Sequence, residues 1–258
     1  MIPKIIHYCW LSNDAFPKTI EKCIATWKEK LPDYEFILWD TNRFNLEQNS
    51  WVKQAFETKK YAFAADYIRL YAVYNFGGIY LDTDIEVVKS FDDLLELPYF
   101  IGSEGNQIIE AGVFGAAQHC DWVGKCLDYY QGKSFINQDA TFNTLTLPRI
   151  MMSQIEQFKT IVELPKSEIF KRHANGLDTN SLLLFPQDYF CAKNQGTGII
   201  NATQNTYSIH HFAMSWVPKR VTFLPNIKRK LISFFGLKTI NRVIDFFNLK
   251  SIKDKLTK

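Results

Sequence analysis

The feature that most constrains the fold is residues 61–87, YAFAADYIRLYAVYNFGGIYLDTDIEV. Its first part continues an apolar helical spacing that we expect over 50–76, and the pair Gly77–Gly78 is a natural helix stop. The apolar run GIYL that follows has the character of a buried strand, and it breaks where Asp82 and Asp84 begin. A helix that leads directly into a buried strand is typical of a layered α/β protein.

The rest of the chain continues this alternation. Residues 2–11 and 35–40 have the pattern of short buried strands, and 12–34 between them has the pattern of a loop and an amphipathic helix. This order predicts an α/β unit with a parallel sheet. Further strands are expected at 99–104, 111–116 and 181–186, and further helices at 121–131 and 147–158.

Length and composition indicate one main domain. A chain of 258 residues with 47% hydrophobic content can bury one large core. We expect that domain over 1–225, followed by a basic amphipathic helical tail over 226–258. The chain has a net charge of +3, and its excess of positive charge lies in this tail, because residues 228–258 hold nine Lys and Arg against two Asp. A mildly acidic body with no basic stripe argues against nucleic-acid binding.

Cysteine use and hydropathy exclude several other classes. The five cysteines are odd in number and form no CxxC, so neither a disulfide scaffold nor a structural zinc site is expected. The first residues lack the pattern of a signal peptide, and no apolar run approaches the roughly 18 residues of a membrane-spanning helix. We therefore expect a cytoplasmic protein.

The two acids after the strand point to a cation. Asp82 and Asp84 flank one residue, and carboxylates this close repel each other unless a hard divalent ion or a basic group lies between them. A metal held in this way commonly carries phosphate as a further ligand. The alternative is that the pair merely begins a solvated turn, and a DxD motif on its own does not decide between them.

The preceding helix adds an opposed charge pair. Ala62, Ala65, Asp66 and Arg69 follow helical spacing and share one face. Small residues beside an acid and a guanidinium allow a ligand to approach, with the acid suited to hydroxyl groups and the guanidinium to phosphate. The alternative is an ordinary surface ion pair, which contributes little to stability.

Three segments carry a family resemblance. AADYIRLYAVYNFGGIYLDTD resembles the signature of the DxD-containing glycosyltransferases of family 32, which includes yeast-type initiating mannosyltransferases and bacterial capsule enzymes. The large clostridial glucosylating toxins share this signature more distantly. IPKIIHYCW near the start and SIHHFAMSW at 208–216 resemble the family's first strand and terminal motif. The resemblance implies a single domain of the GT-A type, a Rossmann-like mixed sheet flanked by helices, which binds a nucleotide-sugar.

The resemblance also implies roles for individual residues. Trp10 matches the aromatic residue that stacks on the nucleotide base, and Asp66 and Arg69 match the acid and guanidinium near the ribose and sugar hydroxyls. Asp82 and Asp84 match the DxD, whose second acid ligates Mn²⁺ or Mg²⁺ while the first contacts ribose, sugar or metal-bound water.

The terminal motif supplies the remaining groups. Of the adjacent histidines, which point to different sides, His211 is chosen as the third metal ligand by its distance from Trp216. Ser215 and Trp216 match groups near the leaving diphosphate. A divalent ion that bridges the two phosphates stabilises the charge of that leaving group, and an imidazole beside two carboxylates suits Mn²⁺ better than Ca²⁺.

Glu110 is a departure from the family pattern. It stands in GNQIIEAGVFGA where asparagine is more usual in a donor-sugar contact. Family members retain the anomeric configuration, which needs either a carboxylate nucleophile or attack from the front face within an ion pair. Glu110 is the candidate nucleophile, but front-face transfer is the preferred mechanism. Glu104, Asn106 and Asp139 are candidates to line the acceptor side, each with the alternative of being an ordinary loop residue.

The tail suggests a membrane surface. Residues 227–258 alternate apolar clusters with lysine and arginine, which suits an interfacial helix on an anionic membrane. The alternative is a helix packed on the body or on a second copy. A peripheral contact at the inner face of the cell membrane fits an enzyme whose acceptor is a lipid-linked glycan.

The sequence therefore predicts a retaining, metal-dependent glycosyltransferase. It would move a hexose from a nucleotide-sugar, with UDP-hexose favoured over GDP-mannose, to a glycan or lipid-linked glycan in polysaccharide biosynthesis such as that of a capsule. One alternative is a phosphohydrolase of the haloacid dehalogenase type, although Glu86 stands where that family needs Thr or Val. The other is a non-catalytic glycan-binding protein with a decayed site.

Overall fold

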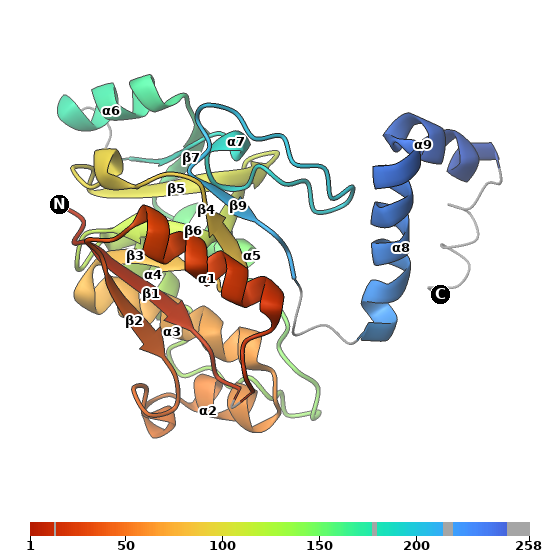
Figure 1. The fold of residues 1–258 in the computed structure, drawn as a ribbon. Coiled ribbons are helices and arrows are strands. Elements are labelled where there is room, and N and C mark those ends of the chain that lie inside the picture. The colour runs from red at the N-terminus through yellow and green to blue at the C-terminus, as the bar shows by residue number, and fades with distance from the viewer. Residues whose placement is uncertain (13, 177–179, 214–218, 247–258) are drawn as a thin grey trace. The chain divides into compact units, whose positions relative to one another are not determined.

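The computed structural model describes residues 1–12, 14–176, 180–213 and 219–246 (Figure 1). They fall into two compact units. The first unit comprises Met1–Ala192 with Ala202–His211, and it contains the sheets and seven helices of the described chain. The second comprises Lys193–Asn201 with Phe212–Lys258.

The centre of the first unit is a five-stranded mixed sheet. Its strands run in the order β2 (Glu35–Trp39), β1 (Ile5–Cys9), β3 (Gly78–Leu81), β6 (Ile108–Ala116) and β5 (Tyr99–Gly105). The first three are parallel, as predicted, whereas β6 is antiparallel to both β3 and β5. The reversal arises because β5 and β6 form a hairpin whose two turn residues, Asn106 and Gln107, both have positive φ.

Helices cover the sheet and two smaller sheets join it. The helices of this unit are α1 (Lys18–Lys30), α2 (Ser50–Glu57), α3 (Tyr61–Phe76), α4 (Asp121–Asp128), α5 (Leu147–Ile155), α6 (Lys166–Ala174) and α7 (Gln187–Phe190), with single turns at Leu46–Gln48 and Asp92–Leu94. The smaller sheets pair β4 (Ile85–Val87) with β9 (Ser208–His210), and β7 (Thr160–Glu163) with β8 (Ser181–Leu184). This architecture confirms the predicted α/β class with a mixed central sheet flanked by helices.

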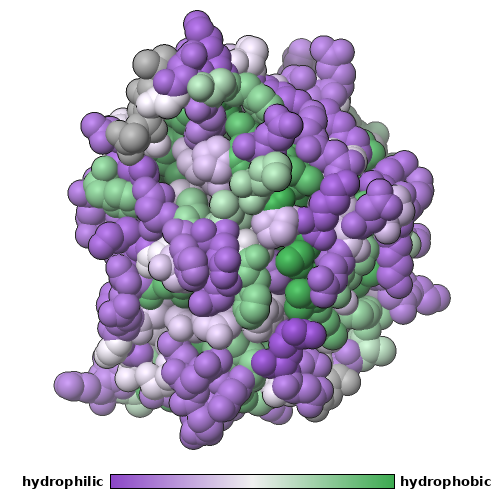
Figure 2. Space-filling view, turned by 90° about the vertical axis from the view of Figure 1, so that its left-hand side faces the viewer, coloured by the Kyte–Doolittle hydropathy of each residue, from purple (hydrophilic) through white to green (hydrophobic). Residues whose placement is uncertain are grey.

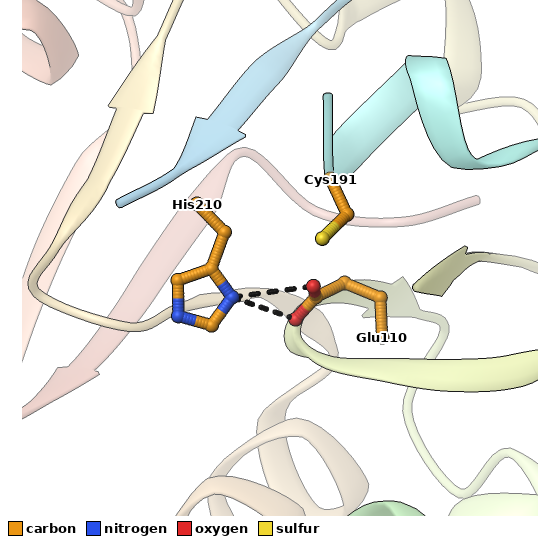
Figure 3. Close-up of side chains that lie close together, drawn as sticks. All are labelled: Glu110, Cys191 and His210. Carbon is orange, nitrogen blue, oxygen red and sulfur yellow. Dashed lines mark hydrogen bonds and ion pairs between the residues drawn. The ribbon is translucent and has the colours of Figure 1, made fainter. Parts of the chain in front are cut away.

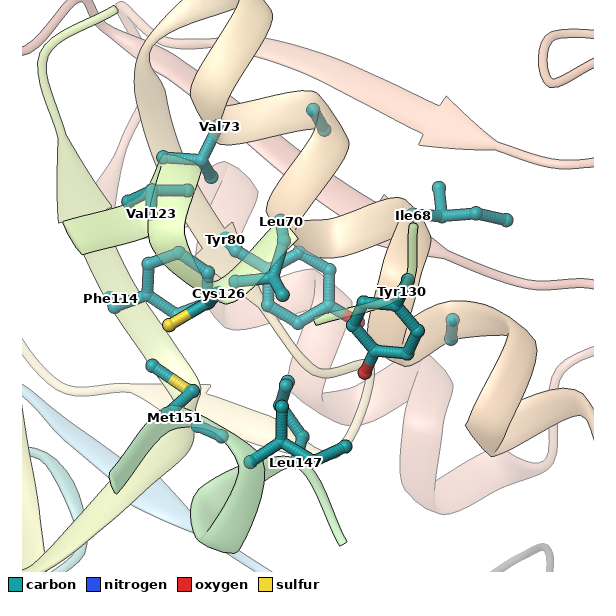
Figure 4. Packing of buried hydrophobic residues seen from close by; sticks show 14 of the residues in the cluster. Ile68, Leu70, Val73, Tyr80, Phe114, Val123, Cys126, Tyr130, Leu147 and Met151 are labelled. Carbon is teal, nitrogen blue, oxygen red and sulfur yellow. The ribbon is translucent and has the colours of Figure 1, made fainter. Parts of the chain in front are cut away.

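The sheet separates two hydrophobic cores, because side chains alternate along a strand. Ile79 and Leu81 of β3 pack into one core with Trp27 of α1, whereas Tyr80 between them packs into the other. Figure 4 shows this second core, in which residues of α3, α4 and α5 surround Tyr80 and Phe114. The outer face in Figure 2 is covered mostly by hydrophilic residues, with smaller hydrophobic areas between them.

One predicted helix is divided in two. The sequence pattern predicted helix over 50–76, but α2 ends at Glu57 and α3 begins at Tyr61. Between them Lys59 has a φ of 57°, which no α-helical residue adopts. The break lets α2 and α3 pack against each other instead of extending as one long helix.

The end of α3 is a tight junction that needs glycine. Gly77 and Gly78 have φ values of 65° and 103°, and a Cβ on Gly78 would lie 2.7 Å from the carbonyl oxygen of Ile5. The buried ring of His7 holds this junction, since its Nε2 donates to the carbonyl of Gly77 (2.8 Å). Its Nδ1 accepts from the indole nitrogen of Trp39 (3.1 Å), so His7 is held as the neutral ring.

The second unit contains a short bridge and two helices. Lys193 pairs with Ile200, and α8 (Lys219–Phe235) is followed by α9 (Leu237–Phe246), with Gly236 at a φ of 78° between the helices. Helix was expected from 226 onward, and α8 begins earlier and crosses that position. The predicted domain boundary at 225/226 remains a prediction, and the end of the expected tail, 247–258, lies outside the described residues. None of the helices in the described ranges combines the length and the apolar character needed to cross a membrane.

The burial of His7 leads us to expect that the free energy of unfolding falls in acid. Burial lowers the pKa of His7 from 6.5 to about 4. Between these values the unfolded chain binds a proton that the folded chain does not, so the stability that neutral His7 provides is complete above pH 6.5 and is lost as the pH falls towards 4. We expect this loss to reach about 3 kcal/mol, and to be absent in His7→Gln, whose amide can both donate to Gly77 and accept from Trp39. Denaturant unfolding of both proteins between pH 7.5 and 4 tests this, and parallel pH profiles would contradict it.

Candidate active site

The candidate site lies where β3 ends. The backbone nitrogen of Asp82 still donates to the carbonyl of Gly112 on β6 (2.8 Å), and the chain then turns so that Ile85 donates back to the carbonyl of Asp82 (3.0 Å). After this turn β4 leaves the central sheet and pairs with β9. The central sheet therefore ends at the two aspartates. Their carboxylates lie beside the C-terminal ends of the parallel strands, which is where open α/β sheets bind ligands.

Arg69 is buried between two acids. Its Nη2 lies 3.2 Å from Asp66 and 3.2 Å from Asp82, and its Nη1 donates to the carbonyl of Ala111 (2.9 Å). The guanidinium also lies over the ring of Tyr80, 4.6 Å from its centroid, and the Tyr80 hydroxyl donates to Asp82 (2.8 Å). Asp66 and Arg69 are 9% and 6% exposed, so the alternative of an ordinary surface ion pair is wrong.

The two acids beside Arg69 are held in a low-dielectric environment. Burial raises the pKa of Asp66 to about 7, although the Arg69 guanidinium acts to lower it. Burial likewise raises the pKa of Asp82, with Arg69 opposing and the nearby charge of Asp84 adding to the rise. One guanidinium is therefore insufficient to stabilise all of the negative charge gathered here, and a further cation would stabilise the ionised carboxylates.

His210 lies between acids on both sides of its ring. Its Nε2 is 3.4 Å from Asp84, and its Nδ1 is 3.2 Å from each carboxylate oxygen of Glu110 (Figure 3). Burial acts to lower the pKa of His210, but the charges of Glu110 and Asp84 outweigh it and raise that pKa well above its ordinary value. The strand pairing of β9 with β4 brings His210 to this position, opposite Ile85.

A divalent metal ion fits these residues. Asp82, Asp84 and His210 each offer one ligand atom, and these atoms lie within 4.8 Å of one another. Gly112 makes this convergence possible, because a Cβ there would lie 3.0 Å from the Asp82 carboxylate, 3.0 Å from the His210 ring and 2.7 Å from Glu110. Two carboxylates with one imidazole form a donor set suited to Mn²⁺.

His211, the ligand expected from the sequence, lies elsewhere. Its Nε2 is 2.7 Å from Glu86, and its backbone nitrogen donates to the carbonyl of Asp84. The reason is strand geometry, because adjacent side chains point to opposite sides and only one histidine can face the aspartates. The structure therefore places His210, and not His211, beside Asp82 and Asp84.

Trp10 lies at the same edge of the sheet as the aspartates. It directly follows β1, which is parallel to β3, so the two strands end on the same side. Its indole nitrogen donates to the carbonyl of Asp14 (2.8 Å), and its half-buried ring lies 4.9 Å from that of Phe16. Ser215 and Trp216, the expected diphosphate contacts, lie outside the described residues.

Glu110 and the candidate acceptor-side residues have different environments. The side chain of Glu110 is 1% exposed, which leaves no free oxygen directed at solvent. Glu104 on β5 lies near it, and burial raises the pKa of Glu104 to about 7, with the charge of Glu110 adding to the rise. Asn106 forms the β5–β6 turn, and Asp139 accepts from Thr141 within its own loop (2.6 Å). The sequence patterns did not single out Gly112, whose signal was its place two residues after Glu110.

Comparison with known proteins defines the class. Residues 17–101, a stretch that includes Asp66, Arg69, Asp82 and Asp84, match the family model described as "Glycosyltransferase sugar-binding region containing DXD motif". This match to part of the chain confirms the resemblance to the DxD-containing glycosyltransferases.

Two of the relatives that match are fungal enzymes named for mannosyl transfer. The chain is 32% identical to inositol phosphoceramide mannosyltransferase 3 of Schizosaccharomyces pombe, over 45% of this chain and 34% of that protein. It is 30% identical to mannosyl phosphorylinositol ceramide synthase CSH1 of Saccharomyces cerevisiae, over 53% of this chain and 38% of that protein. The chain thus spans little more than a third of the length of these curated relatives. A solved structure named PaToxG Glycosyltransferase aligns with a TM-score of 0.44 at 20% identity, over 68% of this chain and 75% of that one.

Gly112 generates a prediction about stability. Gly112→Ala would force a methyl group against three site side chains, and we expect it to lower the free energy of unfolding by about 1–3 kcal/mol. The matched control is Gly196→Ala, whose Cβ would meet only Asn194 at 3.5 Å and which we expect to change stability by less than about 0.5 kcal/mol. Denaturant unfolding measures both, and equal stabilities of the two variants would show that the site is not packed in this way.

Proposed function

We propose that the protein is a metal-dependent glycosyltransferase that moves a sugar from a nucleotide-sugar to a glycan or lipid-linked acceptor. The observation that carries this proposal is the convergence of Asp82, Asp84 and His210 at the end of β3, partly within the region that matches the DXD family model. Acids gathered this closely are costly in a folded protein unless cations lie between them. This site suits the binding of a sugar diphosphate.

Each group then has a role in the transfer. Asp82, Asp84 and His210 would hold Mn²⁺ or Mg²⁺, which supplies positive charge for the departing diphosphate. Arg69 fixes the orientation of Asp82 through its ion pair, and Asp66 is placed on the same helix to accept from ribose or sugar hydroxyls. Trp10 provides a half-buried aromatic face for the base. Ser215 and Trp216 keep their expected role near the diphosphate as part of the proposal.

The mechanism that best suits this site retains the anomeric configuration by front-face transfer. A nucleophilic Glu110 would need an oxygen directed at the donor, but both of its oxygens face His210 and the side chain is buried. With Glu110 directed at His210, the acceptor hydroxyl would attack the anomeric carbon on the face that the phosphate leaves, and the departing phosphate would take the proton of that hydroxyl.

The relatives bear on the choice of donor and acceptor. Both are named for mannosyl transfer to inositol phosphoceramide. Their names favour a mannosyl donor, GDP-mannose, over the UDP-hexose preferred from the sequence, and they favour an acceptor that carries a lipid. A role in capsule formation has no comparable support.

The second unit supports contact with a membrane surface. On α8 the side chains of Phe234 and Phe235 are 83% and 62% exposed, and Leu231 is also exposed. A run of basic residues, Lys228, Arg229 and Lys230, directly precedes these apolar residues on the same helix. Exposed aromatic residues among cations suit the headgroup region of an anionic membrane, which would bring the enzyme to a lipid-linked acceptor. The proposed location is the inner face of the cell membrane.

The ligand role of Asp84 gives the central experiment. The purified chain, offered a panel of nucleotide-sugars with Mn²⁺, is expected to release a nucleoside diphosphate slowly without acceptor. Asp84→Asn should reduce this release by at least about a hundredfold, because it removes a charged ligand. Asp33→Asn, which changes an exposed aspartate, should leave it unchanged.

Other outcomes would favour other functions. Phosphate release from simple phosphomonoesters would instead favour the phosphohydrolase. If no nucleotide bound in a metal-dependent way, the protein would be a glycan-binding protein without catalysis.

The membrane proposal has its own test. Substituting Phe234 and Phe235 together by Asp is expected to weaken co-sedimentation with phosphatidylglycerol vesicles by at least about tenfold, because two rings that would enter the membrane are lost and two negative charges are added. Phe158→Asp, an exposed phenylalanine of the first unit, is the control and should bind as the unmodified chain does. If deletion of residues 228–258 left vesicle binding unchanged, the proposed membrane contact would be wrong.

A further inference from the structure

Glu110 is a fully buried carboxylate that the proposed reaction does not use. It lies on β6 with its side chain 1% exposed, and both of its oxygens lie 3.2 Å from the ring of the proposed ligand His210. Buried carboxylates are costly unless donors surround them. The groups that donate hydrogen bonds to Glu110 therefore indicate the role of this carboxylate.

Three elements supply donors to Glu110. The backbone nitrogen of Gly112 donates to Oε1 (2.6 Å), which fixes the carboxylate against its own strand. His210 of β9 places its Nδ1 at 3.2 Å from both oxygens, and the buried thiol of Cys191, next to the end of α7, is a further hydrogen-bond partner (Figure 3). The carboxylate thus joins three parts of the fold, and only His210 extends beyond it towards the DxD aspartates.

Glu110, Cys191 and His210 could in principle hold a metal ion of their own, since their ligand atoms also lie within 4.8 Å of one another. Two observations favour a hydrogen-bonded cluster instead. The Cys191 thiol is buried beside a carboxylate, which raises its pKa far above the usual range, so it remains a protonated donor. The Nδ1 of His210 already faces Glu110, so these groups satisfy one another without an ion.

We propose that Glu110 is a positioning residue for His210: it accepts the Nδ1 proton, so that the ring is locked with Nε2 and its lone pair towards Asp82 and Asp84. An ion bound at Nε2 takes the place of a proton there, so the metal-bound ring carries one N–H, and the carboxylate of Glu110 holds that N–H at Nδ1. Such carboxylate–histidine–metal arrangements orient the ring and raise its affinity for the ion. This inference rests on the proposed function, because it concerns the same metal site.

The geometry assigns this role to Glu110 rather than to its neighbours. Asp84 lies on the opposite nitrogen, at 3.4 Å from Nε2, which is where the ion would be shared. Glu104 is a second carboxylate close to Glu110, but its effect on His210 is one of charge only. Removing Glu104 therefore tests the loss of a nearby acid without the loss of the hydrogen bond.

The experiment measures Mn²⁺ affinity of the full chain by electron paramagnetic resonance, independently of turnover. Glu110→Ala is expected to raise the Kd for Mn²⁺ by roughly 10- to 100-fold. Glu110→Gln, whose side-chain oxygen still accepts from Nδ1, should raise it by less than about fivefold. Glu104→Gln should leave it unchanged. Circular dichroism melting confirms that each variant is folded.

A second readout is the tautomer of His210. In protein labelled with ¹⁵N-histidine and loaded with Mg²⁺, the proton is expected on Nδ1 of His210, and in Glu110→Gln the same tautomer should persist. The tautomer of His210 tests the proposed role of Glu110 even when Glu110→Ala does not fold. A proton found on Nε2 in the unmodified protein would overturn the inference.

The remaining outcomes separate this inference from the proposed function. If the unmodified chain binds no Mn²⁺, the proposed metal-dependent function fails. If it binds Mn²⁺ and Glu110→Ala binds equally well, only the role of Glu110 fails. If Gln and Ala abolish transfer alike while Mn²⁺ affinity is unchanged, Glu110 acts chemically and is not a positioning residue.

Discussion

The ion pair of Arg69 with Asp66 and Asp82 is the interaction on which the site depends. It joins α3 to the end of β3, and through the carbonyl of Ala111 it also joins β6. Without the guanidinium two buried carboxylates would face each other, and breaking a buried pair in this way costs about 3–5 kcal/mol. The helix, the strand and the acidic edge are therefore placed as one rigid group.

This arrangement separates two electrostatic tasks. Arg69 is already occupied by Asp66, Asp82 and a backbone carbonyl, so it stabilises the protein's own charges. The charge of a departing diphosphate needs another source of positive potential, which is the reason that a cation between Asp82, Asp84 and His210 fits the chemistry. Glu110 lies at the other nitrogen of His210 from Asp84, and in the proposed arrangement this carboxylate determines which nitrogen the ring presents to the ion.

Much of this could be predicted from local sequence. The helix over α3, its glycine stop and the strand that delivers Asp82 depend on neighbours a few residues apart, so periodicity was sufficient. The choice between His210 and His211 depends instead on the register of β9 against β4, which no local pattern records. The need for glycine at position 112 could not be predicted either, because it arises from three side chains that the fold brings close to it. The break at Lys59 is set by the packing of α2 on α3.

The ladder between β4 and β9 links the site to the order in which the chain is made. It has only three residue pairs, and it joins segments from the first and last parts of the first unit. Closing so long a loop is entropically costly and slow, and three pairs offset little of that cost. A chain still on the ribosome with its end before Ser208 would already have both aspartates and no imidazole between them. The complete ligand set thus exists only after β9 has been made and has paired with β4, and metal binding would report on that pairing.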